Sequence, residues 1–406
     1  MPRRLLQLAL SSLVLFYASF ASAGVTYRNI HVFGRSAGQP SSGLVLDAQG
    51  YAYGTTFQGG SKGGGTVYRI SPTGAFEIIY VFSGHPDGKH PQGNVAFDAN
   101  GNLYGTTVNG GKFTSCNQGL GCGTVFMLTP PPGGKGPWAE TVLYNFAGGA
   151  NDGQNPKAGV TLDTEGNLYG TTELGGYQGD PECQEEGGGC GTVFELVRSE
   201  SEWTEVLLHI FTGTFGDGEL SQSGLVFDAA GNLYGTTAVT AFEMSPIEGG
   251  WTLDVIHYFG AGDDGNGLAA GMVFDAAGNL YGTAEGGGQA SMGVVFELSP
   301  DAGGWTETIL HNFAGGKDGA QPMAGVALDA QGNIYGTTYR GGILPIGVGT
   351  VYELTPADNG QWSEAVFALR PKRGQGAGPA APVLLVGNAL YTTYSASPGG
   401  VFRLAR

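Results

Sequence analysis

Histidine is the side chain that most often does chemistry near neutral pH, and the chain contains six of them. Four share one setting, two residues before a phenylalanine in a recurring apolar segment: His31, His209, His257 and His311. In equivalent segments the same position holds Tyr80, Tyr144 and Phe367. A position that accepts His, Tyr or Phe indicates aromatic packing in an outer strand. We therefore predict no metal ligand and no catalytic histidine there.

A first series of aspartates ends short apolar segments, just before turns such as "AAGN". Its members are Asp47, Asp98, Asp163, Asp228, Asp275 and Asp329. An Asp at this place can accept hydrogen bonds from backbone N–H groups two residues on, while the following Gly or Asn adopts a positive φ. A calcium site is the alternative, but calcium needs about 6–8 oxygens at one point, and one Asp per repeat does not converge. The series predicts hairpin turns.

A second acidic series precedes glycine in longer connections, and its members are Asp87, Asp152, Asp217, Asp264 and Asp318. His90 lies in the first of these connections, within "GHPDGKHPQG". Asp180 and Glu182 lie in a long Gly-rich loop of the third repeat. Long loops on a rigid scaffold often carry binding function, so these eight residues form the candidate binding face. The alternative, that the Asp-Gly pairs are only turns, stays open.

Four cysteines occur as two close pairs, Cys116 with Cys122 and Cys183 with Cys190. In an exported protein an even number of cysteines suggests disulfides, and the local pairings are preferred among the three possible connectivities. A zinc site would require both pairs to converge without any histidine nearby in the sequence. The prediction is two disulfides, no metal site and no cofactor.

The segments that carry these residues repeat along the chain. The motif "YGT" begins at Tyr53, Tyr104, Tyr169, Tyr234, Tyr281 and Tyr335, and a degenerate copy, "LYTTY", contains Tyr391. Each unit of about fifty residues holds four segments rich in Val, Leu, Ile, Phe, Tyr and Thr. The segments are bounded by Gly, Pro, Asp or Asn, which are strand and turn signals.

Seven units of four antiparallel strands predict an all-β, seven-bladed β-propeller formed by a single domain, residues 24–406. With strands A to D numbered from the axis outward, the D–A and B–C connections emerge on one face. The second aspartate series, His90, Asp180, Glu182 and the cysteines share that face. The last unit ends after strand C, and residues 25–33 resemble a D strand. We therefore predict that this N-terminal strand completes blade seven.

The N-terminus predicts export. Residues 1–23 combine a basic start, an apolar stretch and "ASA", which is typical of a signal peptide cleaved after Ala23. An extracytoplasmic protein, periplasmic or secreted, with no membrane span after cleavage, is expected. The net charge of −17 disfavours nucleic acids and anionic membranes as partners.

The repeated motifs "LDAQGNIYGTTYRGG", "GTVYELTP" and "HNFAGGKDGAQPMAG" resemble the GloVer repeats of bacterial exported tandem-repeat (choice-of-anchor) proteins. The resemblance extends over nearly the whole mature chain, from about Val25 to Arg406. It implies a secreted, propeller-like protein and supplies no catalytic residue. Unit four lacks the "GG" after "GTT", and unit seven has lost its Asp and "YGT".

These observations favour a non-catalytic, monomeric binding or scaffold module that engages a glycan, an envelope polymer or a protein through its D–A/B–C face. One alternative is an extracytoplasmic hydrolase or lyase that acts on a polysaccharide or lactone. That alternative expects acids such as Asp87, Asp152 or Asp318 near the axis. Another alternative is a structural or adhesive surface module, in which the repeat itself is the function.

Overall fold

The computed structural model describes residues 25–405, apart from 35–37, 135, 177–178, 180–182, 184–187, 200–201, 214–215, 261–262, 343–346, 359, 370–377 and 396–398. The predicted signal peptide and the candidate residues Asp180 and Glu182 lie outside the described residues. The part of the chain that the structure describes contains no helix of the length and apolarity needed to cross a bilayer.

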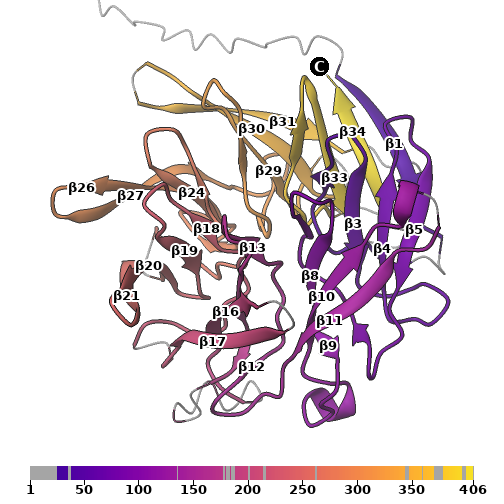
Figure 1. Cartoon of the computed structure of the whole chain (residues 1–406). Coiled ribbons are helices and arrows are strands. Elements are labelled where there is room, and N and C mark those ends of the chain that lie inside the picture. The colour runs from indigo at the N-terminus through magenta and orange to yellow at the C-terminus, as the bar shows by residue number, and fades with distance from the viewer. Residues whose placement is uncertain are drawn as a thin grey trace, which may run out of the picture.

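Seven four-stranded antiparallel sheets follow one another around a ring, as the sequence predicts (Figure 1). Blade 1 consists of β2 (Val45–Leu46), β3 (Ala52–Thr56), β4 (Thr66–Ile70) and β5 (Phe76–Val81). Blade 2 consists of β7 (Ala96–Phe97), β8 (Leu103–Thr107), β10 (Thr124–Thr129) and β11 (Ala139–Asn145). Blade 3 consists of β13 (Thr161–Leu162), β14 (Leu168–Thr172), β16 (Thr192–Arg198) and β17 (Trp203–Ile210).

The next three blades repeat this order. Blade 4 consists of β18 (Val226–Phe227), β19 (Leu233–Thr236), β20 (Thr240–Ile247) and β21 (Gly250–Tyr258). Blade 5 consists of β23 (Val273–Phe274), β24 (Leu280–Ala284), β26 (Val294–Asp301) and β27 (Gly304–Asn312). Blade 6 consists of β28 (Ala327–Leu328), β29 (Ile334–Thr338), β30 (Thr350–Pro356) and β31 (Trp362–Ala368).

The two ends of the chain complete blade 7 together. Its strands are β32 (Leu384–Val386), β33 (Ala389–Tyr394), β34 (Gly400–Ala405) and, outermost, β1 (Thr26–Val32). β1 pairs antiparallel with β34, from Thr26 opposite Ala405 to Val32 opposite Gly400. Figure 1 shows the indigo β1 beside the yellow β34. The predicted closure is thus confirmed.

Three small sheets join the D–A connections to the B–C loops of the following blade. They pair β6 (Gly88–Lys89) with β9 (Asn109–Gly110), β12 (Gly153–Gln154) with β15 (Leu174–Gly175), and β22 (Gly265–Asn266) with β25 (Gly286–Gly287). Among the described residues, two short 3₁₀ turns, η1 (Asn117–Gly119) and η2 (Pro132–Gly134), lie in loops of blade 2. Because the small sheets pair them directly, the D–A connections and the B–C loops lie on one face of the ring, which we call the loop face.

The aspartates of the first series form the predicted hairpin turns. Oδ1 of Asp47 accepts hydrogen bonds of 2.9 Å from the backbone N–H groups of Gln49 and Tyr51. Oδ2 of Asp47 accepts the hydroxyl of Tyr53, and the other five aspartates also accept the hydroxyl of a "YGT" tyrosine. The carboxylate thus ties together strand A, the turn and strand B.

The innermost strands are shorter than the sequence predicts. The apolar run 43–47 yields only β2, because side-chain hydrogen bonds interrupt the ladder before it, although the backbone N–H of Ser41 still donates to the Thr55 carbonyl at 3.1 Å. The backbone N–H of Thr55, for example, donates to Ser42 Oγ at 2.8 Å, and Ser41 Oγ donates to the carbonyl of Pro91 at 2.9 Å. The segments before strand A therefore do not belong to the blade sheets, and they lie along the axis of the ring.

The threonines of "GTT" hold neighbouring blades together. The first threonine of the motif donates to a carbonyl just before strand A of the next blade. Its hydroxyl bonds join Thr55 to Gly93, Thr106 to Ala158, Thr171 to Ser223, Thr236 to Ala270, Thr283 to Ala324, Thr337 to Ala381 and Thr393 to Ser42. The motif's glycine admits an aromatic ring from strand C: a Cβ on Gly170 would lie 2.6 Å from Phe194 Cζ.

The tryptophans that begin the D strands pack between blades. Trp138 of blade 2 is buried and lies edge-on to Tyr53 of blade 1, with ring centroids 6.1 Å apart. Trp203, Trp251 and Trp305 contact Tyr104, Tyr169 and Tyr234 in the same manner. Their position is explained by the covering of blade edges.

Candidate functional site

A cavity of about 710 Å³ opens along the axis of the ring, a volume in the range of small-molecule sites. All seven blades contribute to its wall, chiefly through the segments 39–43, 92–95, 157–161, 222–225, 269–273, 323–326 and 380–382. The wall combines small and apolar residues with the amides of Gln39, Gln92, Asn94 and Gln222 and with the hydroxyls of several serines and threonines, such as Ser41. Such a wall offers hydrogen bonds to a ligand without offering strong charge.

The charged residue of this wall is neutralised. Lys157 Nζ forms a short ion pair with Glu173 Oε1, which also accepts a 2.8 Å hydrogen bond from Gln222 Nε2. The two charged side chains keep 23% and 13% of their exposure, so the pair is largely shielded. The lysine therefore presents its stem and a compensated charge to the cavity.

Backbone strain gathers in the connections that lead to the cavity. His90, Asn155, Leu220 and Gln321 have φ of 61°, 57°, 55° and 58°, in the left-handed region that non-glycine residues rarely adopt. Glycines occupy the corresponding places in other blades, for example Gly267 with φ 69°. Such strain is held only where the surroundings enforce it, and it often accompanies binding sites.

His90 lies beside the cavity but is held by other groups. Its ring stacks on Phe57, a residue of the cavity wall, with centroids 4.4 Å apart. Nδ1 of His90 lies 2.8 Å from Asn109 Oδ1, and burial lowers the pKa of the ring. The neutral ring thus joins the cavity wall to the B–C loop of blade 2.

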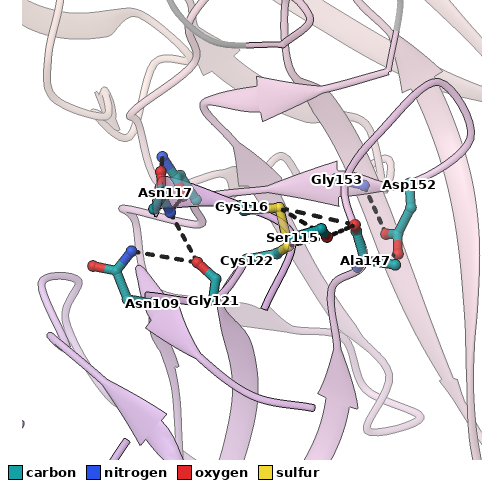
Figure 2. The surroundings of a disulfide bond; sticks show 10 residues. Asn109, Ser115, Cys116, Asn117, Gly121, Cys122, Ala147, Asp152 and Gly153 are labelled. Carbon is teal, nitrogen blue, oxygen red and sulfur yellow. Dashed lines mark hydrogen bonds between the residues drawn. A yellow bond between two sulfur atoms is a disulfide. The ribbon is translucent and has the colours of Figure 1, made fainter. Parts of the chain in front are cut away.

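The predicted disulfides are both present, Cys116–Cys122 and Cys183–Cys190. The first one fastens the long loop of blade 2 against the next D–A connection, as Figure 2 shows. The backbone N–H of Asn155 donates to the Cys122 carbonyl at 2.9 Å, and Asn117 Nδ2 donates to Asn155 Oδ1 at 2.6 Å. The disulfide thus steadies a segment that leads into the cavity.

The five aspartates of the second series lie on the loop face, but next to the outer strands. None of them belongs to the described residues that line the cavity. Asp87 and Asp152 accept backbone N–H groups of Ser83 and Ala147, and Asp217 accepts that of Thr212, so they act as turn residues. The hydrolase alternative expected such acids near the axis, and the structure places them elsewhere.

Each of these aspartates also meets the aromatic position of strand D. Asp87 accepts a 3.2 Å hydrogen bond from the Tyr80 hydroxyl, and Asp217 lies 2.6 Å from His209 Nε2. A β-bulge precedes this position in blades 1–5, and bulges turn side chains in new directions. The bulge aims the Tyr or His into the contact between the outer strands of two neighbouring blades, which we call a seam.

A glutamate from the following blade completes four of the seams, and sequence reasoning missed it. These residues are Glu140, Glu205, Glu307 and Glu364, each two residues after the tryptophan that begins strand D. The Tyr144 hydroxyl donates to Glu205 Oε2 at 2.8 Å, for example. The recurring pattern W-x-E can be recognised in the sequence. However, the glutamate lies beside an aspartate about fifty residues earlier only because neighbouring blades pack against each other in the ring.

In each of these seams the glutamate lies beside an aspartate, and the pKa of the glutamate is raised. Burial, followed by the neighbouring Asp, raises the pKa of Glu140 to about 7 and that of Glu205 to about 8. Burial raises the pKa of Glu307 to about 8 and that of Glu364 to about 9. Near neutral pH, such a pair therefore tends to share one proton.

Asp217 behaves differently because its seam lacks the glutamate. Leu253 occupies the equivalent place in strand D of blade 4, two residues after Trp251. Burial acts to raise the pKa of Asp217, but hydrogen bonds from His209 and Thr212 outweigh it and lower the pKa. The carboxylate is thus ionised and pairs with the imidazole.

Seven closed blades around an axial cavity define a β-propeller with a potential binding site at its centre. The sequence matches the family model described as the Gloeobacter/Verrucomicrobia repeat over residues 14–181 and 237–405, more than half of the chain. The chain belongs to this repeat family. The comparison with curated proteins found no match.

Solved structures share the fold at low identity. One is the extracellular domain assigned to the hybrid two component system BT4673 from B. thetaiotaomicron, with a TM-score of 0.58 and 10% identity over 94% of this chain and 40% of that one. The chain thus spans well under half the length of that neighbour.

Two further structures match less well. The gluconolactonase XC5397 from Xanthomonas campestris has a TM-score of 0.42 and 13% identity, over 94% of this chain and 89% of that one. The PQQ-bound aldose sugar dehydrogenase from Streptomyces coelicolor has a TM-score of 0.43 and 12% identity, over 94% of this chain and 98% of that one.

Proposed function

We propose that this protein is an extracytoplasmic binding module that takes a neutral, hydroxyl-rich ligand, a glycan segment or envelope polymer, into the axial cavity from the loop face. The observation that carries the proposal is the cavity wall, which all seven blades line and to which Gln39, Gln92 and Gln222 contribute amides and Ser41 and Thr393 contribute hydroxyls. Sugars present many donors and acceptors and little charge, which suits such a wall.

Charge supports the same ligand class. The chain carries a net charge of −17, and the cavity's lysine is already paired with Glu173, so a polyanion gains little there. The wall supplies hydrogen-bonding groups rather than pairs of titratable side chains, which favours binding over turnover. Two disulfides support an oxidising, extracytoplasmic location.

The test is binding by the purified mature protein to an array of neutral and anionic oligosaccharides, followed by calorimetry on the neutral ones that bind. Replacing both Gln39 and Gln92 by alanine removes two polar groups of the wall, and each lost hydrogen bond costs about 0.5–1.5 kcal/mol. The double variant is expected to weaken binding about five-fold or more.

The matched control is Gln331→Ala, which removes an exposed glutamine from an A–B turn on the opposite face. It is expected to leave the affinity unchanged. The proposal fails if no neutral glycan binds, or if the control and the Gln39/Gln92 double variant bind equally well.

A further inference from the structure

Two neighbouring seams bring together three different metal-binding side chains. Between blades 4 and 5 these are His257, Asp264 and Glu307, and between blades 5 and 6 they are His311, Asp318 and Glu364. In each cluster one ligand atom from every residue lies within 4.8 Å of the others. His257 and His311 come from the position after the bulge, so the backbone itself aims them at the acids.

The spacing of these atoms matches the coordination shell of a small metal ion. His257 Nε2 lies 3.5 Å from Asp264 Oδ2 and 3.6 Å from Glu307 Oε2. Ligands bound tetrahedrally to zinc at about 2.0–2.1 Å lie about 3.3 Å from one another. In the second cluster, His311 Nε2 lies 3.1 Å from Asp318 Oδ1 and 3.6 Å from Glu364 Oε1.

Several atoms that face these clusters are buried without a hydrogen-bond partner among the described residues. They are His257 Nε2, Glu307 Oε1 and Glu364 Oε1, and the seams between blades 1 and 2 and between blades 2 and 3 leave Glu140 Oε1 and Glu205 Oε1 unpaired in the same way. A buried polar atom left unpaired costs about 1–3 kcal/mol, so its retention needs a reason. A metal ion held by the imidazole and the carboxylates supplies that reason for His257 Nε2, because Nε2 of His209 and of His311, at equivalent positions, each lies within hydrogen-bond distance of an aspartate.

The other seams of the molecule carry different residues at the positions that the histidine and the glutamate occupy in the two clusters. Between blades 2 and 3, Tyr144 takes the place of the histidine and donates its hydroxyl to Glu205 at 2.8 Å. Between blades 3 and 4, Leu253 takes the place of the glutamate, and His209 bonds Asp217 directly at 2.6 Å. In the 5–6 seam, His311 Nε2 also lies within hydrogen-bond distance of Asp318 Oδ1, at 3.1 Å, whereas His257 Nε2 has no hydrogen-bond partner among the described residues.

From this geometry we propose that the 4–5 and 5–6 seams each bind one divalent transition-metal ion of the zinc type. Three protein ligands, one imidazole nitrogen and two carboxylates, leave the fourth position of the ion to water. Calcium is a poor alternative, because it prefers about 6–8 oxygen ligands. The side chains retain 15–23% exposure, so an ion can enter from solvent. The histidine pattern alone predicted no metal site, because the glutamates of the neighbouring blades are not adjacent to the histidines in the sequence.

The experiment measures zinc stoichiometry in the mature, tag-free protein. The protein is stripped with EDTA, dialysed against ZnCl₂ and analysed for bound zinc, with the affinity measured by calorimetry. The expected result is two Zn²⁺ per chain for the wild type. His257→Tyr and His311→Tyr, which each copy the 2–3 seam, should each retain one, and the double variant none.

The matched control is His209→Tyr in the 3–4 seam, which is expected to keep two bound ions. Should a tyrosine variant fold poorly, Glu307→Leu and Glu364→Leu copy the 3–4 seam instead and are expected to lose one ion each. Far-ultraviolet circular dichroism in EDTA verifies the fold of every variant. The proposal is overturned if the wild type binds no stoichiometric zinc, or if the folded double variant binds as much as the wild type.

Discussion

At the scale of single residues, the role of a side chain depends on what the neighbouring blade places opposite it. The position after the D-strand bulge faces glutamate in some seams, leucine in another, and Phe76 in the seam where His31 stacks with centroids 3.8 Å apart. The threonine of "GTT" has a constant role, because its partner is a backbone carbonyl, which every sequence provides.

Thr106→Val tests this role of the threonine. The hydroxyl of Thr106 is buried and donates to the Ala158 carbonyl at 2.6 Å, which links blades 2 and 3. Valine has a similar shape but leaves that carbonyl unpaired, so the free energy of unfolding should fall by about 1–3 kcal/mol. Chemical denaturation measures the change. Thr141→Val, at an exposed place in β11, serves as control and should stay within about 0.5 kcal/mol.

Glu205→Gln tests the shared proton of the 2–3 seam. Burial and Asp152 raise the pKa of Glu205 from 4.5 to about 8, so the folded state binds a proton that the unfolded chain releases. Stability from this group is therefore complete below pH 4.5 and is lost as the pH rises toward 8, with a slope of at most about 1.4 kcal/mol per pH unit.

The glutamine variant should lose this pH dependence, because its amide needs no proton and can still accept the Tyr144 hydroxyl. Thermal melts at pH 5 and pH 8.5 measure the effect. The variant should equal the wild type at pH 5 and exceed it by on the order of 1 kcal/mol at pH 8.5. Glu202→Gln, at an exposed place in the same blade, should leave the wild-type dependence intact, and a parallel shift of both variants would contradict the assignment.

At the scale of elements, the sequence predicts what is local. Strand segments, Asp turns, both disulfides and the closing strand 25–33 follow from patterns within a few residues or from the missing D strand at the other end. The seam clusters do not follow, because Asp152 and Glu205 meet only when blades 2 and 3 pack side by side, with Tyr144 directed toward Glu205 by the bulge of blade 2. The cavity wall was also missed, since its residues precede the strands and carry no chemical motif.

The disulfide loop of blade 2 provides a prediction about an element. Replacing Cys116 and Cys122 by serine opens a loop closed over a sequence separation of six, and a loop of this size contributes about 2 kcal/mol. Hydrogen exchange should accelerate in residues 108–123 and in the connection 147–155 that they contact, while blade 6 stays protected.

The matched control for that experiment replaces Cys183 and Cys190 by serine. This change should affect the B–C loop of blade 3 and leave residues 108–123 protected as in the wild type. Uniform acceleration across all blades in the first variant would show that the disulfide supports the whole ring rather than one loop.

At the scale of the whole molecule, the closed ring places each repeat in contact with its neighbours, so that the functional and stabilising features are formed by more than one blade. Each blade buries aromatic residues against the next one, and the cavity, the seams and the threonine bonds all join two or more blades. Such a structure leaves only short edges at the inner and outer strand of each blade, and the ring is complete only while β1 pairs with β34. Closure therefore determines the stability of every seam.

Removal of the closing strand is the sharpest test of this dependence. A chain that begins at residue 34 lacks β1, leaves β34 as an exposed edge and loses Phe33, which is 1% exposed and donates its backbone N–H to the Gly399 carbonyl at 2.8 Å. Loss of a buried phenylalanine side chain alone costs about 3–5 kcal/mol, so the truncated protein should melt at a much lower temperature and self-associate through its open edge.

A synthetic peptide of residues 25–33 should restore the melting temperature in a concentration-dependent manner, since it binds only the folded ring. Calorimetry and analytical ultracentrifugation of the truncated chain, with and without the peptide and beside the chain that begins at residue 24, measure both effects. An unchanged melting temperature after truncation would show that the ring stays closed without its N-terminal strand.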